Sequence, residues 1–148
     1  MATLTITGIM IFITLLFVMS YKAGTQVSLS ALADKWRWLL LVALWSQVLL
    51  LPQMLEITPN NWQWAASLGI FAIIICGGAN IYDKTDEIVH IIAAVIAFSC
   101  FLLWIIIINW LYIVPLIVCI CAGKERWKWR AEIGLIIGVY MTLLAHII

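Results

Sequence analysis

The chain has 148 residues, of which 66% are hydrophobic and only 10% are charged, and its mean hydropathy is +1.16. About a quarter of the residues of an ordinary soluble domain are charged, so this composition excludes a water-soluble globular protein and predicts a membrane protein. The formal net charge of +1 gives no reason to expect nucleic acid as a partner.

Six apolar segments follow one another along the chain, and each is expected to form a membrane-spanning helix. The first has no basic residue before it and no small-residue cleavage site after it, which predicts a retained span rather than a signal peptide. A helix needs about 20 predominantly apolar residues to cross the hydrocarbon core. The predicted spans are 4–21, 36–51, 62–81, 88–108, 110–122 and 131–148.

The fourth and fifth segments form one continuous apolar run from Ile88 to Gly123. As a single helix with a rise of about 1.5 Å per residue it would be roughly 54 Å long, far more than a hydrocarbon core of about 30 Å. Asn109 and Trp110 are the predicted turn between the two spans. Pro115 is expected to bend the short fifth helix.

The basic residues predict the orientation. If the chain crosses six times, its first, third and fifth loops share one side of the membrane, and these loops hold all eight Lys and Arg residues. Loops rich in Lys and Arg stay in the cytoplasm, so both termini are expected outside. The predicted fold is an all-α, polytopic transmembrane bundle of six helices. It forms one domain over residues 1–148 in the cell membrane (the inner membrane if the cell is Gram-negative).

Tryptophans mark the predicted membrane boundaries, because W-x-W pairs open the second, third and sixth spans. Amphipathic aromatic rings collect at the membrane interface, although such rings also form cages for cations or lipid headgroups. Trp45 and Trp104 lie deeper and are expected to pack in the bundle or to line a cavity. The predicted interface anchors are Trp36, Trp38, Trp62, Trp64, Trp127 and Trp129.

An acidic cluster precedes the fourth span in the stretch "YDKTDEIVH". Thr85 is a predicted N-cap, and Asp86 and Glu87 would lie in the first turn, where the helix dipole favours carboxylates. His90 is one turn after Asp86 and is expected to pair with it. The alternative is a cation- or proton-binding vestibule formed by Asp83 together with these three titratable residues, because ionisable groups at membrane depth are candidates for function.

Other polar and small residues within the spans predict helix contacts. Gln47, Ser99 and Tyr140 are expected to form hydrogen bonds between helices or, alternatively, to line a polar cavity inside the membrane. Gly134 and Gly138 form a GxxxG match in the sixth span. This motif brings helices close together, more often within one protomer than between two; a homo-oligomer or another membrane partner is left open.

No metal, cofactor or catalytic site is predicted. The four cysteines lie in apolar surroundings, and Cys119 and Cys121 have no second pair of ligands at zinc spacing. The two histidines, His90 and His146, are expected near opposite membrane boundaries, about 20 Å or more apart. Zinc bonds to nitrogen are near ~2 Å, so the two cannot share an ion, and the chain is not expected to be an enzyme.

Several segments resemble a group of small six-span membrane proteins of gut Bacteroidetes. They are "SLSA" at 28–31, Pro52 after the second span, "ITPNNWQWAASLGIF" at 57–71 and "YDKTDEIVHIIAA" at 82–94. The resemblance covers most of the chain. It implies a six-span architecture in a lipid bilayer and no particular chemistry.

Two functions from different classes are consistent with these features. The first is a non-enzymatic membrane protein that binds a small ligand, a lipid or a partner helix within its bundle. The second is an oligomeric pore or ion pathway, in which the acidic residues around Asp86 form a vestibule that attracts cations.

Overall fold

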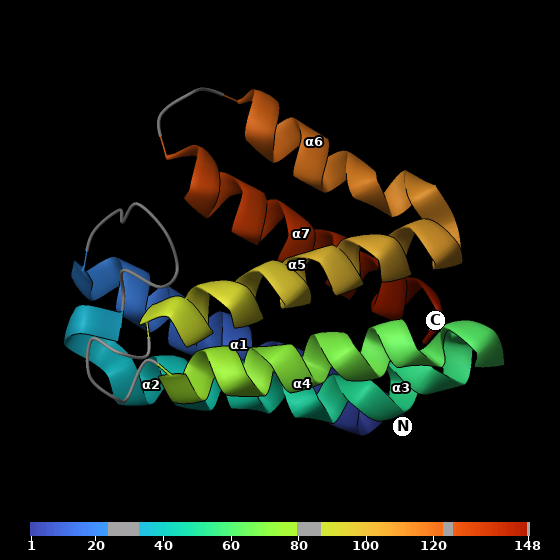
Figure 1. Cartoon of the computed structure of the whole chain (residues 1–148), viewed down its shortest axis with the longest axis horizontal. Coiled ribbons are helices and arrows are strands. Elements are labelled where there is room, and N and C mark those ends of the chain that lie inside the picture. The colour runs from blue at the N-terminus through green and yellow to red at the C-terminus, as the bar shows by residue number, and fades with distance from the viewer. Residues whose placement is uncertain (24–32, 80–86, 123–125, 148) are drawn as a thin grey trace.

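The computed structural model describes residues 1–23, 33–79, 87–122 and 126–147, and the regular elements in this part of the chain are all helical. Figure 1 shows that the helices form rods and that each rod runs in the opposite direction to the one before it along the long axis. Both termini therefore lie at the same end. The helices are α1 (Ala2–Ala23), α2 (Ala33–Trp45), α3 (Leu51–Ile57), α4 (Gln63–Ala79), α5 (Glu87–Asn109), α6 (Val114–Cys121) and α7 (Trp127–Ala145). Three 3₁₀ turns complete them: η2 (Ser46–Leu50), η3 (Asn60–Trp62) and η5 (Trp110–Ile113).

The predicted all-helical fold is confirmed, and its helices suggest a membrane protein. Within the described residues, four helical stretches are long and apolar enough to cross a bilayer: Ala2–Tyr21, Trp36–Ile57, Asn60–Ala79 and Ile88–Cys121. The second differs from the predicted 36–51, because the helical path continues through η2 and α3 to Ile57. The segment from Ala131 falls in α7, which is not among these four stretches because charged residues occupy its first turns.

Two prolines explain why 3₁₀ turns interrupt the rods. Pro52 has no N–H to donate to the carbonyl of Val48, and the N–H of Leu51 donates to that carbonyl instead. This bond from residue i to residue i−3 tightens the backbone of η2 into a 3₁₀ turn. Pro115 has the same effect before α6, where the N–H of Val114 replaces the missing donor.

The long apolar run after Glu87 is broken where the sequence predicts a turn. Asn109 has an extended backbone (φ −165°, ψ 107°), and its side-chain oxygen accepts a hydrogen bond from the N–H of Leu111 at 3.1 Å. After this break α6 returns alongside α7, opposite in direction to α5 (Figure 1). Pro115 does not bend a helix as predicted. It lies in the first turn of α6, where proline costs no intrahelical hydrogen bond.

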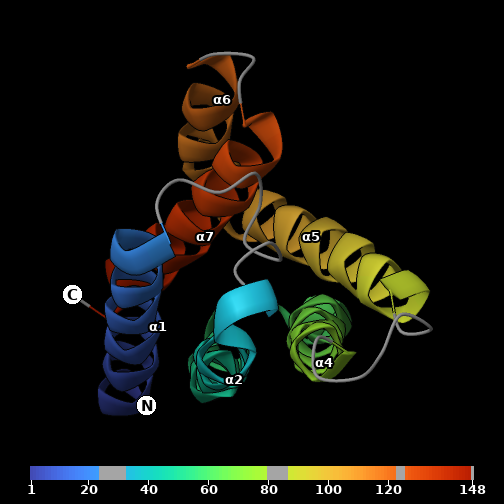
Figure 2. The same ribbon diagram turned by 90° about the vertical axis from the view of Figure 1, so that its left-hand side faces the viewer.

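Each helix packs against its neighbours: α4 contacts α2 and α5, and α7 contacts α5 and α6. In Figure 2, α1, α2 and α4 lie side by side, α5 and α7 lie above them, and α6 is outermost. Glycine allows α6 and α7 to approach closely, because a Cβ at Gly134 would lie 2.7 Å from the Cα of Leu116. A Cβ at Gly138 would lie 2.6 Å from the carbonyl oxygen of Tyr112. The GxxxG pair therefore lies at a helix contact within this chain.

Candidate binding pocket

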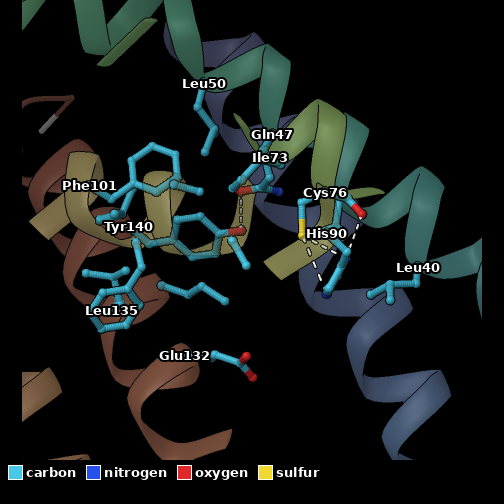
Figure 3. A pocket seen from close by; sticks show the side chains of 16 residues that line it. Leu40, Gln47, Leu50, Ile73, Cys76, His90, Phe101, Glu132, Leu135 and Tyr140 are labelled. Atoms are coloured by element: carbon cyan, nitrogen blue, oxygen red, sulfur yellow. Dashed lines mark hydrogen bonds between the residues drawn. The ribbon is translucent and has the colours of Figure 1, made fainter. Parts of the chain in front are cut away.

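A cavity of about 150 Å³ lies in the middle of the bundle, between α2, η2, α4, α5 and α7. Most of its wall is aliphatic or aromatic, and the polar side chains are few enough to consider one by one. The lining residues are Leu40, Leu44, Gln47, Leu50, Ile73, Cys76, His90, Ala94, Ala97, Phe98, Phe101, Glu132, Leu135, Ile136, Val139 and Tyr140. Figure 3 shows ten of these side chains with their labels.

The first polar pair joins two helices that are far apart in the sequence. The hydroxyl of Tyr140 on α7 donates to the side-chain oxygen of Gln47 on η2 at 2.8 Å. The amide nitrogen of Gln47 lies 3.3 Å from the hydroxyl of Ser46 and 3.5 Å from the carbonyl of Ala43, which holds the amide in this orientation. The ring of Phe12 on α1 meets the Tyr140 ring edge-on, with centroids 6.1 Å apart. The pair is thus held by both hydrogen bonds and packing.

The second polar pair lies at the other end of the cavity (Figure 3). Nδ1 of His90, on the first turn of α5, is 3.1 Å from the backbone carbonyl oxygen of Cys76 and 3.4 Å from its sulfur. A carbonyl can only accept, so Nδ1 carries the proton and donates to it. This contact ties the start of α5 to the end of α4.

A carboxylate completes the polar groups of the cavity. Glu132, on the second turn of α7, lines the wall, and Figure 3 shows its side chain pointing away from α7 toward the side of His90 and Leu40. Lysine and arginine are absent from the lining formed by the described residues. His90 and Glu132 make one end of the cavity polar, whereas the end near Leu50 and Phe101 is apolar.

The structure brings together some of the predicted site residues. Gln47 and Tyr140 form a hydrogen bond between η2 and α7 on the wall of a largely apolar cavity, whereas Ser99, the third residue of the predicted polar cavity, is exposed on the outer face of α5. His90 lines the same cavity. Asp83 and Asp86 lie outside the described residues, so the predicted pair of Asp86 with His90 and the acidic vestibule stay predictions. Glu87 begins α5, but its side chain is outside the described part as well.

The predicted anchors lie near the ends of helices. Trp38, Trp64 and Trp127 are exposed, and Trp36, Trp62 and Trp129 are partly buried; whether they meet a membrane interface stays a prediction. Trp104 is fully buried, and its Nε1 donates to the hydroxyl of Thr58 at 2.7 Å. Trp45 is half exposed, with its Nε1 3.3 Å from the carbonyl of Ile74.

Two titratable residues of the lining, Glu132 and Cys76, were not predicted from the sequence as site residues. A signal for Glu132 was present, since it is a carboxylate inside the predicted span 131–148, where charged residues are rare and usually functional. Cys76 had no distinguishing signal, because its role depends on which helix lies against the end of α4.

Comparisons with protein families, with curated proteins and with solved structures found no match for this chain.

Proposed function

We propose that this chain is a six-span membrane protein, with both termini outside, that binds a small and largely apolar molecule in the cavity of its bundle. Four stretches apolar enough to span a bilayer support the membrane location. Two features support six crossings. The apolar stretch Ile88–Cys121 contains two rods that run in opposite directions, and both termini lie at one end of the molecule (Figure 1).

The observation that carries the binding proposal is the cavity itself. It measures about 150 Å³ and is partly open to the outside of the bundle, as clefts that bind small molecules are. An apolar cavity of about that volume is large enough to hold benzene. Small-molecule sites have this character: an apolar wall with a few placed polar groups.

Two phenylalanine substitutions at neighbouring positions, one inside the cavity and one outside it, test the proposal. Ala94 lines the cavity, whereas the next residue, Val95, is exposed on the outer face of α5. Ala94→Phe should fill the cavity, and Val95→Phe adds a similar ring outside it. With benzyl alcohol as the probe at about 100 times its Kd, binding should stabilise the purified protein by about 2.7 kcal/mol.

Thermal unfolding should show this stabilisation in the wild type and in Val95→Phe, and it should be absent in Ala94→Phe. A second, wholly apolar groove lies on the α4/α5 surface and is lined by residues such as Phe71, Ile75 and Ala93. Equal stabilisation of all three proteins would mean that the probe acts at that groove or on the detergent, and it would contradict the proposal.

An ion pathway is the second candidate, and the cavity supports it less well. Beyond the bond between Gln47 and Tyr140, the side chains of Leu50 and Phe101 that line the cavity are apolar and offer an ion no ligands. Ion flux across liposomes that hold the purified protein, abolished by neutralising Asp86 and Glu87, would favour the pathway over the binding site.

A further inference from the structure

The hydrogen bond between Tyr140 and Gln47 has a fixed direction, which the groups around the Gln47 amide decide. The carbonyl oxygen of Ala43 can only accept, and the hydroxyl of Ser46 already donates its one proton to that carbonyl at 2.7 Å. Both groups therefore accept from the amide nitrogen of Gln47, which lies 3.5 Å from the Ala43 oxygen and 3.3 Å from the Ser46 oxygen. The side-chain oxygen of Gln47 is left to face Tyr140, so the tyrosine hydroxyl donates to it.

This direction leaves the pair with acceptors for a bound molecule and with no donor. The proton of the Tyr140 hydroxyl is used in the bond with Gln47, whereas the phenolic oxygen keeps a lone pair. The amide oxygen of Gln47 accepts this one proton and has a second lone pair. The protons of the amide nitrogen are directed at Ser46 and Ala43. A polar group of a ligand beside this pair is therefore matched only when it donates a hydrogen bond.

The pair belongs to the wall of the cavity, where most of its neighbours are apolar. Both residues line the cavity and are buried, and Figure 3 shows the two bonded groups in the middle of the labelled side chains. A ligand group that only accepts would lose its hydrogen bonds to water here and gain none from the pair, and an unsatisfied buried polar group is costly. A site with such groups discriminates against the analogue that cannot make the bond.

From the direction of this bond we infer that the ligand carries a hydroxyl group: it is a small alcohol or phenol with an apolar body about the size of a benzene ring. A hydroxyl donates a hydrogen bond and brings no charge into an apolar site. The hydroxyl lies beside Tyr140 and Gln47, and the apolar body extends toward Leu50 and Phe101. This inference rests on the proposed binding function and names the class of molecule that the cavity takes.

Two probes of similar size separate a donor from an acceptor: benzyl alcohol has a hydroxyl group, whereas the nitrile group of benzonitrile can only accept. Their affinities for the purified, full-length protein are measured by calorimetry in the same detergent. Benzyl alcohol should bind more tightly by about fivefold or more, the effect of one hydrogen bond between neutral groups. This comparison uses the wild-type protein and needs no variant to fold.

Two variants break the same hydrogen bond from opposite sides. Gln47→Leu removes the acceptor and releases the Tyr140 proton, which can then donate to either probe, so the preference for benzyl alcohol should fall to within about twofold. Tyr140→Phe removes the donor and leaves the Gln47 oxygen as an acceptor, so the preference should stay at about fivefold. A preference that both variants lose, or that both keep, would not depend on the direction of this bond, and it would overturn the inference.

The failures of the two proposals give different results. If benzonitrile binds the wild type as tightly as benzyl alcohol or more tightly, and Ala94→Phe abolishes the binding of both, then the cavity is a binding site but the inferred hydroxyl group is wrong. If neither probe binds, or if Ala94→Phe leaves their binding unchanged, then the proposed binding function itself is wrong.

Discussion

At the scale of single residues, the hydrogen bond between Tyr140 and Gln47 is the most testable contact of the cavity. Tyr140→Phe removes the donor and leaves the buried oxygen of Gln47 without its partner. We expect a loss of about 0.5–2 kcal/mol in the free energy of unfolding. This is the range for hydrogen bonds between side chains in soluble proteins and in membrane proteins. Denaturation of the purified protein in detergent measures this loss.

Tyr112→Phe is the matched control, since Tyr112 is only partly buried and lies on η5, away from the cavity. It should cost less. Adding Gln47→Leu to Tyr140→Phe should recover part of the loss, because an apolar pair leaves no buried group unsatisfied. Equal losses for the two tyrosines would mean that the bond with Gln47 does not stabilise the bundle.

The same scale shows which site residues a sequence can predict. Gln47 and Tyr140 are polar side chains in apolar spans, and this alone makes them candidates for contact with each other. Ser99 meets the same criterion, but it is two positions beyond Ala97 in α5, and successive helical residues are about 100° apart. Since Ala97 lines the cavity, Ser99 faces outward. The sequence identifies polar residues within apolar spans, whereas the direction that each residue faces around its helix decides which of them are in contact.

At the scale of elements, the packing of α7 against α6 and η5 depends on two glycines. Gly138→Ala would place its Cβ 2.6 Å from the carbonyl oxygen of Tyr112, a backbone atom that can move only if the helices separate. We expect a loss of about 1–3 kcal/mol, as for other overpacked contacts. Gly78→Ala in α4 meets no atom within 4 Å and should be neutral or slightly stabilising, because alanine favours helix.

Thermal unfolding of the two alanine variants compares them directly. If Gly78→Ala were as destabilising as Gly138→Ala, the effect would come from replacing a glycine within a helix and not from the close approach of η5 and α7.

Some boundaries between elements could be predicted from the sequence and others could not, for physical reasons. The break at Asn109 follows from the length of the apolar run, since one helix of that length would greatly exceed the thickness of a bilayer. The 3₁₀ turn η2 was not predicted, although Pro52 causes it by withholding one backbone donor. The second rod also continues to Ile57, past the predicted end at Leu51, because proline in the first turn of a helix does not stop it.

At the scale of the whole molecule, the proposed topology predicts which side of the membrane each loop faces. In a variant without the four native cysteines, Asn60→Cys should react with a membrane-impermeant thiol reagent added to intact cells. Asn60 is exposed between α3 and α4. Lys124→Cys, in the predicted fifth loop and outside the described residues, should react only after the membrane is opened. Reaction of the Lys124 position in intact cells would contradict the six-span topology.

The proposed function is tested most directly by measuring which individual residues respond when benzyl alcohol binds. In protein with ¹³C-labelled alanine methyl groups, NMR titration follows the cavity and the outer groove together, since Ala94 and Ala97 line the cavity and Ala72 and Ala93 line the groove. The proposal predicts that the signals of Ala94 and Ala97 shift with one common Kd while those of Ala72 and Ala93 stay in place. Shifts confined to Ala72 and Ala93, or equal shifts at all four alanines, would contradict a binding site inside the bundle.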